Sequence, residues 1–198
     1  MIPRRPFYFL RHGLTDWNRD GRYQGLSDIP LNERGVQQAE AASRVLAGTR
    51  VDRIVTSPLI RALKTAAIVA EGIRAPIYQD GQLRERDFGS FDGLVIRDVK
   101  MRHGLPPEQS SASILPADAD PWGEIHERVP PVIGRWLAEC PDDAILFVAH
   151  GGVFDAVHQS LVGPRLGVES HHAMPYLCLL YTSPSPRDRT RSRMPSSA

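Results

Sequence analysis

The sequence predicts an α/β fold in which short buried strands carry polar residues to one edge of a parallel sheet. Two continuously apolar runs, residues 7–10 and 144–149, support this prediction, because the buried strands of parallel sheets are apolar along their whole length. Each run is closely followed by a histidine, His12 and His150 respectively. In open α/β sheets, ligands bind just beyond the carboxyl ends of such strands, so both histidines fall where a site is expected.

A loop, a helix and a strand are expected after the first run. Residues 14–30 are polar, and a loop of this length is uncommon unless it is functional. Residues 31–46 carry apolar side chains at helical spacing, with Asn32 as the expected N-cap. Residues 53–56 form a second short strand that leads into a helix, which we expect Ser57 to cap.

Arg61 lies in the first turn of that second helix. A helix N-terminus that follows a strand is a ready anion site, and Arg61 can point at the same anion. A lone arginine more often solvates an exposed helix face, so the sequence leaves both interpretations of Arg61 open.

The middle of the chain is less regular. Residues 77–78 form a weak strand, and residues 83–93 form a loop rich in acidic and basic side chains, with two glycines. Glu85 in this loop is the candidate proton donor, and a surface charge cluster is the alternative interpretation. Residues 101–120 contain several prolines, serines and alanines and are expected to form an inserted irregular loop.

The last third of the chain returns to regular structure. A second Arg-His-Gly, at residues 102–104, is interpreted as a coincidence because no apolar strand precedes it. Residues 122–138 are expected to form a helix that Pro130 and Pro131 either start late or kink. A further helix is expected from residue 153 to about 161, after the strand that ends before His150.

Length and composition indicate one domain and exclude several kinds of partner. The chain has 198 residues, 41% of them hydrophobic, which suits a domain with a sizeable core. No apolar run is long enough to span a membrane and no signal-peptide core precedes the first strand, so we expect a cytoplasmic protein without a membrane partner. The formal net charge of +1 indicates no nucleic-acid partner. No cysteine or histidine, His171 and His172 included, has metal-ligand spacing.

Residues 178–198 differ from the rest of the chain. They show no hydrophobic period and hold arginines among serines and prolines, a composition typical of a basic disordered tail. Translation of a common transposase sequencing adapter gives residues 178–188 without a mismatch, so we interpret the segment as a non-native tail. Residues 178–181 are apolar and can prolong a terminal strand, and disorder is expected from Thr182. The expected domain is residues 1–177, without its native C-terminal end.

Four motifs follow one another along the chain. They are Arg11-His12-Gly13, Ser57-Pro58-Leu59 with Arg61, Leu83-x-Glu85 with Gly89, and His150-Gly151-Gly152. Together they resemble the histidine phosphatase superfamily, which includes the cofactor-dependent phosphoglycerate mutases, and the resemblance covers residues 7 to about 177. It implies a three-layer α/β/α sandwich with a mostly parallel central sheet.

The resemblance also implies the roles of the site residues. His12 would be the nucleophile that becomes phosphohistidine, Glu85 would be the general acid and base, and His150 would complete the catalytic set. The residues expected to bind phosphate or substrate are Arg11, Gly13, Asn18, Gln24, Gly25, Arg61 and Gly151.

The chemistry of these residue types agrees with the implied roles. Two guanidiniums can hold phosphate oxygens by paired hydrogen bonds, so we expect neither a metal nor another cofactor. Neighbouring cations disfavour protonation of His12, which keeps a nitrogen lone pair free to attack phosphorus. Glu85 must protonate the leaving alkoxide and then help a water molecule attack the phosphohistidine.

Three features favour the phosphatases of this family over its mutases. Residues 24–26 read Gln-Gly-Leu, where typical mutases carry a small residue before the glycine and a tryptophan after it. Residues 150–153 read His-Gly-Gly-Val, where mutases usually have Gly-Asn-Ser after the histidine. Residues 101–120 hold a single arginine, whereas mutases carry paired arginines in an inserted segment. We therefore expect hydrolysis of a small phosphorylated metabolite, with a phosphoglycerate mutase as the alternative.

The sequence leaves three further questions open. A binding module that has lost its chemistry is the less favoured alternative, because the predicted catalytic residues are all present. Asp155 lies where many family members have an arginine, which places an anion near the pocket and leaves the natural substrate open. The oligomeric state is also open, with a homodimer as one option.

Overall fold

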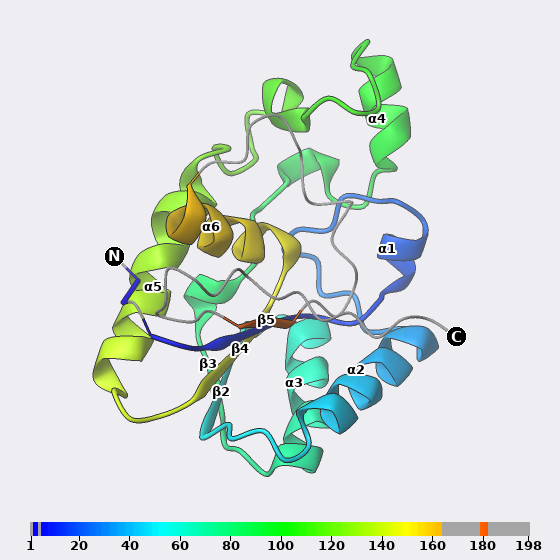
Figure 1. Ribbon diagram of the computed structural model, residues 1–198. Coiled ribbons are helices and arrows are strands. Elements are labelled where there is room, and N and C mark those ends of the chain that lie inside the picture. Colours follow the sequence, from blue (N-terminus) through cyan, green and yellow to red (C-terminus); the bar gives the residue numbers. More distant parts are fainter. Residues whose placement is uncertain (1, 4, 164–178, 182–198) are drawn as a thin grey trace.

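The chain folds into a five-stranded sheet with helices on both faces (Figure 1). The computed structural model describes residues 2–3, 5–163 and 179–181. The strands are β1 (Tyr8–Arg11), β2 (Arg53–Thr56), β3 (Ile77–Gln79), β4 (Ile145–Ala149) and β5 (Leu179–Tyr181). The α-helices are α1 (Asp16–Arg19), α2 (Glu33–Leu46), α3 (Ile60–Ile73), α4 (Ile96–Arg102), α5 (Glu124–Glu139) and α6 (Gly151–Val162). Helices α2 and α3 cover one face of the sheet and α5 and α6 the other, so the predicted three-layer sandwich is confirmed.

The sheet is mostly parallel, as expected. Its strand order is β3-β2-β4-β1-β5, and the pairs β3–β2, β2–β4 and β4–β1 are all parallel. β5 pairs with β1 in the antiparallel direction. It lies in the apolar segment that we expected to prolong a strand, whereas the predicted disorder from Thr182 and the domain end at residue 177 lie outside the described residues.

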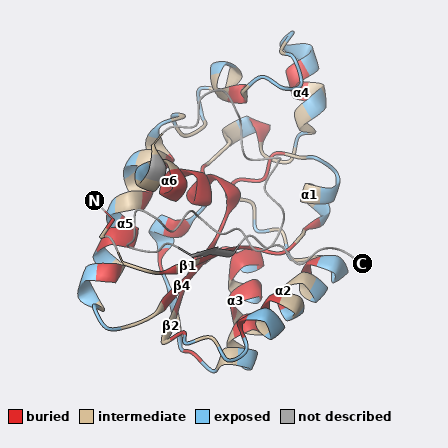
Figure 2. Cartoon of the chain, in the orientation of Figure 1, coloured by how far each residue is buried: buried red, intermediate tan, exposed pale blue. Residues whose placement is uncertain are grey.

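The central strands are buried on both faces, which explains their unbroken apolar sequence. On β1, Phe9 packs with the core under α5 and α6, and the next residue, Leu10, packs with the core under α2 and α3. All five residues of β4 are buried, and Phe147 meets Phe7 edge to face at 5.6 Å between ring centroids. Figure 2 shows this burial running through the sheet and into α6. Within the described part of the chain, no helix has both the length and the apolarity needed to cross a bilayer.

Residues 86–122 fold over the carboxyl edge of the sheet, and we refer to them as the cap. The cap contains α4 and two 3-10 turns, Gly89–Phe91 and Ser111–Ile114. The expectation of a fully irregular insertion at residues 101–120 was therefore wrong in part. Tyr23 packs with Phe91 and Val99 in a small apolar cluster that holds the cap against the loop after β1.

One helix cap was predicted correctly and one was not. The Asn32 side chain caps α2 by accepting the Gly35 N–H at 2.9 Å. Ser57 does not cap α3, because the helix begins two residues later than expected, at Ile60. The Ile60 N–H instead donates to the carboxylate of Asp28 at 2.6 Å, a partner supplied by the loop after α1.

Helix α5 begins before its two prolines, so of the two predicted effects, a late start or a kink, the late start is excluded. Pro130 and Pro131 both lie inside the helix, where they cannot donate to the carbonyls one turn earlier. The apolar face of α5, with Ile125, Val129 and Ile133, is fully buried against the sheet and α6. This tertiary packing outweighs the lost backbone hydrogen bonds, because most helical stability in proteins comes from the packed apolar face.

We predict that Asp28→Ala lowers the free energy of unfolding by about 1 kcal/mol, the usual value of a helix cap with a charge at the N-terminus. Thermal or urea denaturation followed by circular dichroism measures the change. Asp28→Asn is the matched control, because it keeps the acceptor and should lose less. A melting temperature that is unchanged in Asp28→Ala would show that the carboxylate contributes nothing to α3.

Candidate active site

The parallel pairing of β1 with β4 brings the two predicted histidines together. Arg11 lies opposite Ala149 in the ladder, and the His12 N–H continues it by donating to the Ala149 carbonyl at 2.9 Å. The imidazole centroids of His12 and His150 are 5.2 Å apart. The two strand ends therefore form a single site, at the sheet edge where the sequence placed it.

His12 is held in one orientation by the backbone of the next residue. Its Nδ1 lies 2.7 Å from the Gly13 carbonyl oxygen, which can only accept, so Nδ1 carries the proton and Nε2 keeps its lone pair. Burial lowers the pKa of His12 well below its usual value, and the cations Arg61 and Arg11 lower it further. The imidazole is neutral at neutral pH, and its Nε2 has the electronic form of a nucleophile.

His150 is fully buried beside His12. Its Nε2 lies 2.8 Å from the Ser57 hydroxyl oxygen, while its Nδ1 is buried without a hydrogen-bond partner in the described part of the chain. Burial is again the largest cause that lowers the pKa of this histidine, followed by the charge of Arg61. Ser57, expected as a helix cap, instead orients His150.

Arg61 points inward and not along a solvated helix face, which settles the alternative that the sequence left open. It is 0% exposed, and its Nη1 and Nη2 donate to the carbonyls of Ser27 and Gly25 at 2.9 and 2.7 Å. Its Nε is buried and has no hydrogen-bond partner among the described residues. Burial lowers the pKa of Arg61 to about 10, although Glu85 and other carboxylates oppose this, so the guanidinium remains charged at neutral pH.

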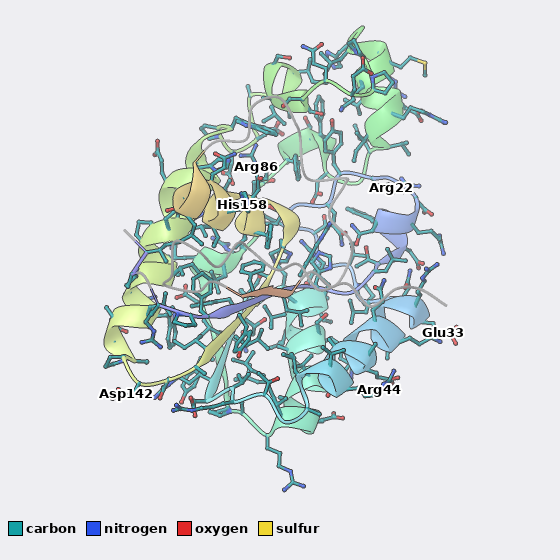
Figure 3. All side chains as sticks on the ribbon, in the orientation of Figure 1. Arg22, Glu33, Arg44, Arg86, Asp142 and His158 are labelled. Carbon is teal, nitrogen blue, oxygen red and sulfur yellow. The ribbon has the colours of Figure 1, made fainter. Side chains whose placement is uncertain are left out.

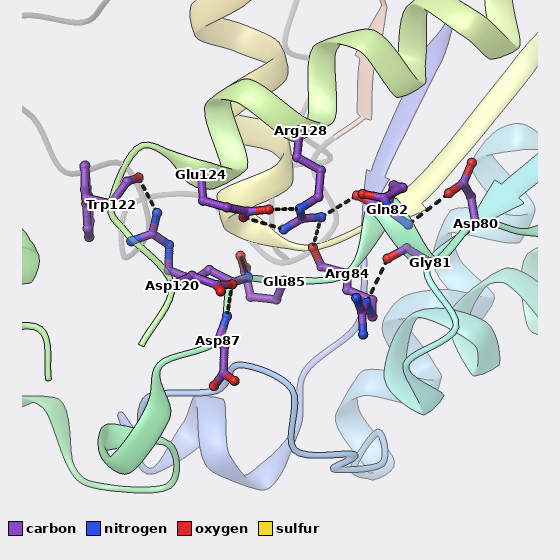
Figure 4. Close-up of polar contacts among 11 residues, drawn as sticks. Asp80, Gly81, Gln82, Arg84, Glu85, Asp87, Asp120, Trp122, Glu124 and Arg128 are labelled. Atoms are coloured by element: carbon purple, nitrogen blue, oxygen red, sulfur yellow. Dashed lines mark hydrogen bonds and ion pairs between the residues drawn. The ribbon is translucent and has the colours of Figure 1, made fainter. Parts of the chain in front are cut away.

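Glu85 faces His150 and its glycines from the other side of the site. It is a buried carboxylate, not part of a surface cluster, and it accepts the Gly152 N–H at Oε2 and the Arg86 N–H at Oε1, both at 3.0 Å. Figure 4 shows Arg128 of α5 donating to the carbonyls of Gln82 and Arg84, which fixes the turn that carries Glu85. A Cβ on Gly152 would lie 2.3 Å from Glu85 Oε1, so any larger residue at this position would force the Glu85 carboxylate to shift.

The segment after β1 contributes the two predicted side-chain amides, those of Asn18 and Gln24. The hydroxyl oxygen of Thr15 lies 2.9 Å from both Asn18 Oδ1 and Gln24 Oε1, which ties the two side chains together. The Gln24 Nε2 is buried without a partner within the described ranges, and both Asn18 and Gln24 line the cavity beside the histidines. They are placed to offer hydrogen bonds to an anion there.

Two of the predicted glycines, Gly13 and Gly25, lie so close to neighbouring backbone that a side chain would not fit. Gly25 donates its N–H to Asp92 Oδ1 at 2.7 Å, and a Cβ there would lie 2.6 Å from the Arg86 carbonyl oxygen. A Cβ on Gly13 would lie 2.4 Å from the carbonyl oxygen of Gly35 in α2. Both positions therefore require close backbone contact, whatever further contact they make with a ligand.

A cavity of about 290 Å³ opens beside the histidines. Of the predicted site residues, those that line it are Arg11, Asn18, Gln24, Glu85 and Gly151. His12, Arg61 and His150 form a buried layer behind this lining, since they are 3%, 0% and 0% exposed. The structure thus brings together all ten predicted site residues, with Gly13 and Gly25 as backbone supports.

Sequence reasoning missed the far wall of the cavity. The additional lining residues with polar or aromatic side chains are Arg22, Tyr23, Arg86, Phe88, Lys100, Ser111 and Trp122. Figure 3 shows Arg22 and Arg86 in the upper part of the molecule, whereas Asp142, which precedes β4, lies at the lower end. Arg86 could have been suspected as the neighbour of Glu85, but no local signal marks Lys100 or Trp122.

Within the described ranges, histidine, cysteine and acidic side chains form no group of three or more that could hold a metal. The pair His171-His172, interpreted as exposed, lies outside those ranges.

We predict that Gly152→Ala lowers phosphatase activity by about a hundredfold, because the new methyl group displaces the Glu85 carboxylate by about an ångström. Gly123→Ala is the matched control, since nothing lies within 4 Å of its added Cβ. Activity on p-nitrophenyl phosphate and the melting temperature are measured for both variants. A Gly152→Ala protein with unchanged activity would show that the position of Glu85 does not matter to the reaction.

Comparison with known proteins identifies relatives along most of the chain. Residues 7–190 match the family description "Histidine phosphatase superfamily (branch 1)". The chain is 33% identical over 154 residues to the uncharacterized phosphatase PhoE of Bacillus subtilis, covering 78% of this chain and 76% of that protein. It is 30% identical over 161 residues to the probable phosphoglycerate mutase GpmB of Cronobacter sakazakii, covering 79% and 74%.

A solved structure shares the fold. The mycobacterial glucosyl-3-phosphoglycerate phosphatase, in complex with VO3, superposes with a TM-score of 0.74 at 28% identity, covering 89% of this chain and 90% of that one. The predicted class of enzyme, a phosphoric monoester hydrolase, is confirmed by these relatives together with the family match. The chain belongs to branch 1 of the histidine phosphatase superfamily.

Proposed function

We propose that this enzyme hydrolyses phosphomonoesters through a phosphohistidine formed on His12. The observation that carries the proposal is the state of the His12 imidazole, which is buried, neutral and protonated at Nδ1, with Nε2 left as the nucleophilic nitrogen. In the first step, Nε2 forms a bond to phosphorus while the bond from phosphorus to the ester oxygen breaks.

Glu85 serves both steps of this proposal. In its protonated form it gives a proton to the departing alkoxide, and the resulting carboxylate then takes a proton from the water that attacks the phosphohistidine. The second attack forms inorganic phosphate, breaks the bond between nitrogen and phosphorus, and restores the neutral imidazole with its lone pair. The hydrogen bond from the Gly152 N–H keeps this carboxyl group next to the strand end that carries His150.

Positive charge for the transferred phosphoryl group comes from arginine. Arg11 lines the cavity, and the Nε of the buried Arg61 has no partner in the part of the chain that the structure describes. His150 and the amides of Asn18 and Gln24 complete the hydrogen-bonding surface around the same point. Charge fixed in a water-poor site stabilises the transition state more than charge in water, so the proposal requires no metal ion.

The substrate class that we propose is a small phosphorylated metabolite. The cavity of about 290 Å³ supports this, because drug-sized and metabolite-sized ligands occupy pockets of roughly 300 Å³ and above. Named relatives support it as well, since one acts on glucosyl-3-phosphoglycerate. A phosphoglycerate mutase remains the second candidate, favoured by the relative named GpmB and by the cations Arg86 and Lys100 at the cavity wall.

We predict that rapid acid-free quenching after mixing with a phosphomonoester traps acid-labile, alkali-stable phosphate on His12. His12→Ala should lose both the trapped phosphate and at least about a thousandfold of turnover, because the covalent route is closed. His103→Ala is the matched control, since it alters the histidine of the second Arg-His-Gly. Trapped phosphate that persists in His12→Ala would disprove the assignment of the nucleophile.

We predict that Glu85→Gln slows turnover of alkyl phosphates by about a hundredfold or more, the usual contribution of a general acid. The loss on p-nitrophenyl phosphate should be clearly smaller at the phosphorylation step, because p-nitrophenolate leaves without a proton. Burst kinetics separates this step from hydrolysis of the intermediate, and the exposed Glu127→Gln serves as control. Equal losses on both kinds of ester at that step would remove Glu85 from the role of acid.

A further inference from the structure

Arg86 is a buried arginine in the wall of the cavity, directly after Glu85. Its side chain is 2% exposed and lines the cavity together with Trp122. Its Nη2 donates to the backbone carbonyl of Trp122, and its Cζ lies 4.3 Å from the centroid of the Trp122 ring. The hydrogen bond and the cation–π contact together fix the plane and the position of the guanidinium.

The rest of this guanidinium has no partner among the residues that the structure describes. Within those residues, both Nε and Nη1 are buried without a hydrogen-bond acceptor. Buried charged groups are nearly always paired, because leaving their N–H groups unsatisfied is costly. Burial accordingly lowers the pKa of Arg86, while the charge of Glu85 raises it.

Carboxylates lie near Arg86, but other groups occupy them. Glu124 is held by Arg128, whose Nε and Nη2 lie 2.5 and 3.1 Å from its two oxygens. Asp120 accepts the backbone N–H of Asp87 at 2.8 Å (Figure 4). None of the acidic side chains in the described ranges forms an ion pair with Arg86, although Glu85, Asp120 and Glu124 favour its charge from a longer distance. Two of its N–H positions therefore have no acceptor within these ranges and can bind one on a ligand.

The site of the reaction and Arg86 share one cavity. Arg11 and Gly151 line it next to the histidines, and Arg86 and Trp122 line it on the cap. We propose that Arg86, held against Trp122, binds a second acidic group of the substrate, a carboxylate or a further phosphate, while the ester phosphate lies at His12. This inference rests on the proposed function, because it assumes that a phosphomonoester occupies the other end of the cavity.

Binding to the inactive His12→Ala protein tests the proposal directly. The probes are 3-phosphoglycerate and glycerol 3-phosphate, which differ in having a carboxylate or a hydroxymethyl group, and propanediol bisphosphate, which carries a second phosphate. Calorimetry should show that at least one of the two diacids binds about tenfold or more tightly than glycerol 3-phosphate, as expected for an added charge-assisted hydrogen bond. The preferred diacid identifies the acidic group.

Arg86→Met in the same background should remove that preference and leave the affinity for glycerol 3-phosphate within about twofold, a change of only about 0.4 kcal/mol. Arg84→Met is the matched control, because it removes the same charge from an exposed side chain of the same loop, and it should keep the preference. A diacid preference that survives in Arg86→Met would overturn the proposal and leave Arg86 as a support for the Trp122 backbone.

Two further measurements keep the outcomes separate. The melting temperature shows whether Arg86→Met folds. If it does not, the affinities of the His12→Ala protein with Arg86 intact test the proposal, and equal affinities for all three probes would overturn it. Turnover of p-nitrophenyl phosphate by the unaltered chain tests the proposed function itself. Turnover without a diacid preference rejects the subsite alone, and a diacid preference without turnover rejects the proposed reaction alone.

Discussion

The structure depends on one backbone hydrogen bond pattern, the parallel ladder between β1 and β4. Its last bond, from His12 N–H to the Ala149 carbonyl, fixes both histidines at the same height above the sheet. β2 joins the same edge, because the Ser57 N–H donates to the Val148 carbonyl at 3.0 Å. The ends of three strands thus converge, so the residues that follow these strands lie close together in one site.

Burial determines the charge states of the residues in this site. The two imidazoles are neutral because they are buried and lie near cations, and Arg61 remains charged because nearby carboxylates stabilise it. Arg61 also holds a loop in place. Arg61 binds the carbonyls of residues 25 and 27, and Asp92 binds the N–H groups of the same two residues at 2.7 and 3.0 Å. Arg61 and Asp92 therefore contribute both to the charge of the site and to the geometry of this loop.

Local sequence patterns predicted the features that depend on local sequence alone. The apolar runs gave β1 and β4, and the residues directly after them gave His12 and His150, because a strand end needs no long-range information. Ser57 was misassigned since the true acceptor for α3, Asp28, comes from a loop 32 residues away. Arg86 and Trp122 are 36 positions apart and are in contact in the cap. No sequence pattern around either residue indicates that contact. The catalytic edge was thus predictable, whereas the wall that would select a substrate was not.

The contact between Gly13 and Gly35 limits how the pocket can move. An added Cβ on Gly35 would lie 2.1 Å from the Leu14 carbonyl oxygen, so the turn after β1 and the first turn of α2 touch backbone to backbone. Such a contact has no side-chain rotamers that could yield, and the interior of a protein is hardly compressible. This side of the pocket is consequently stiff, and any widening that admits a ligand has to come from its other walls, of which the cap is one.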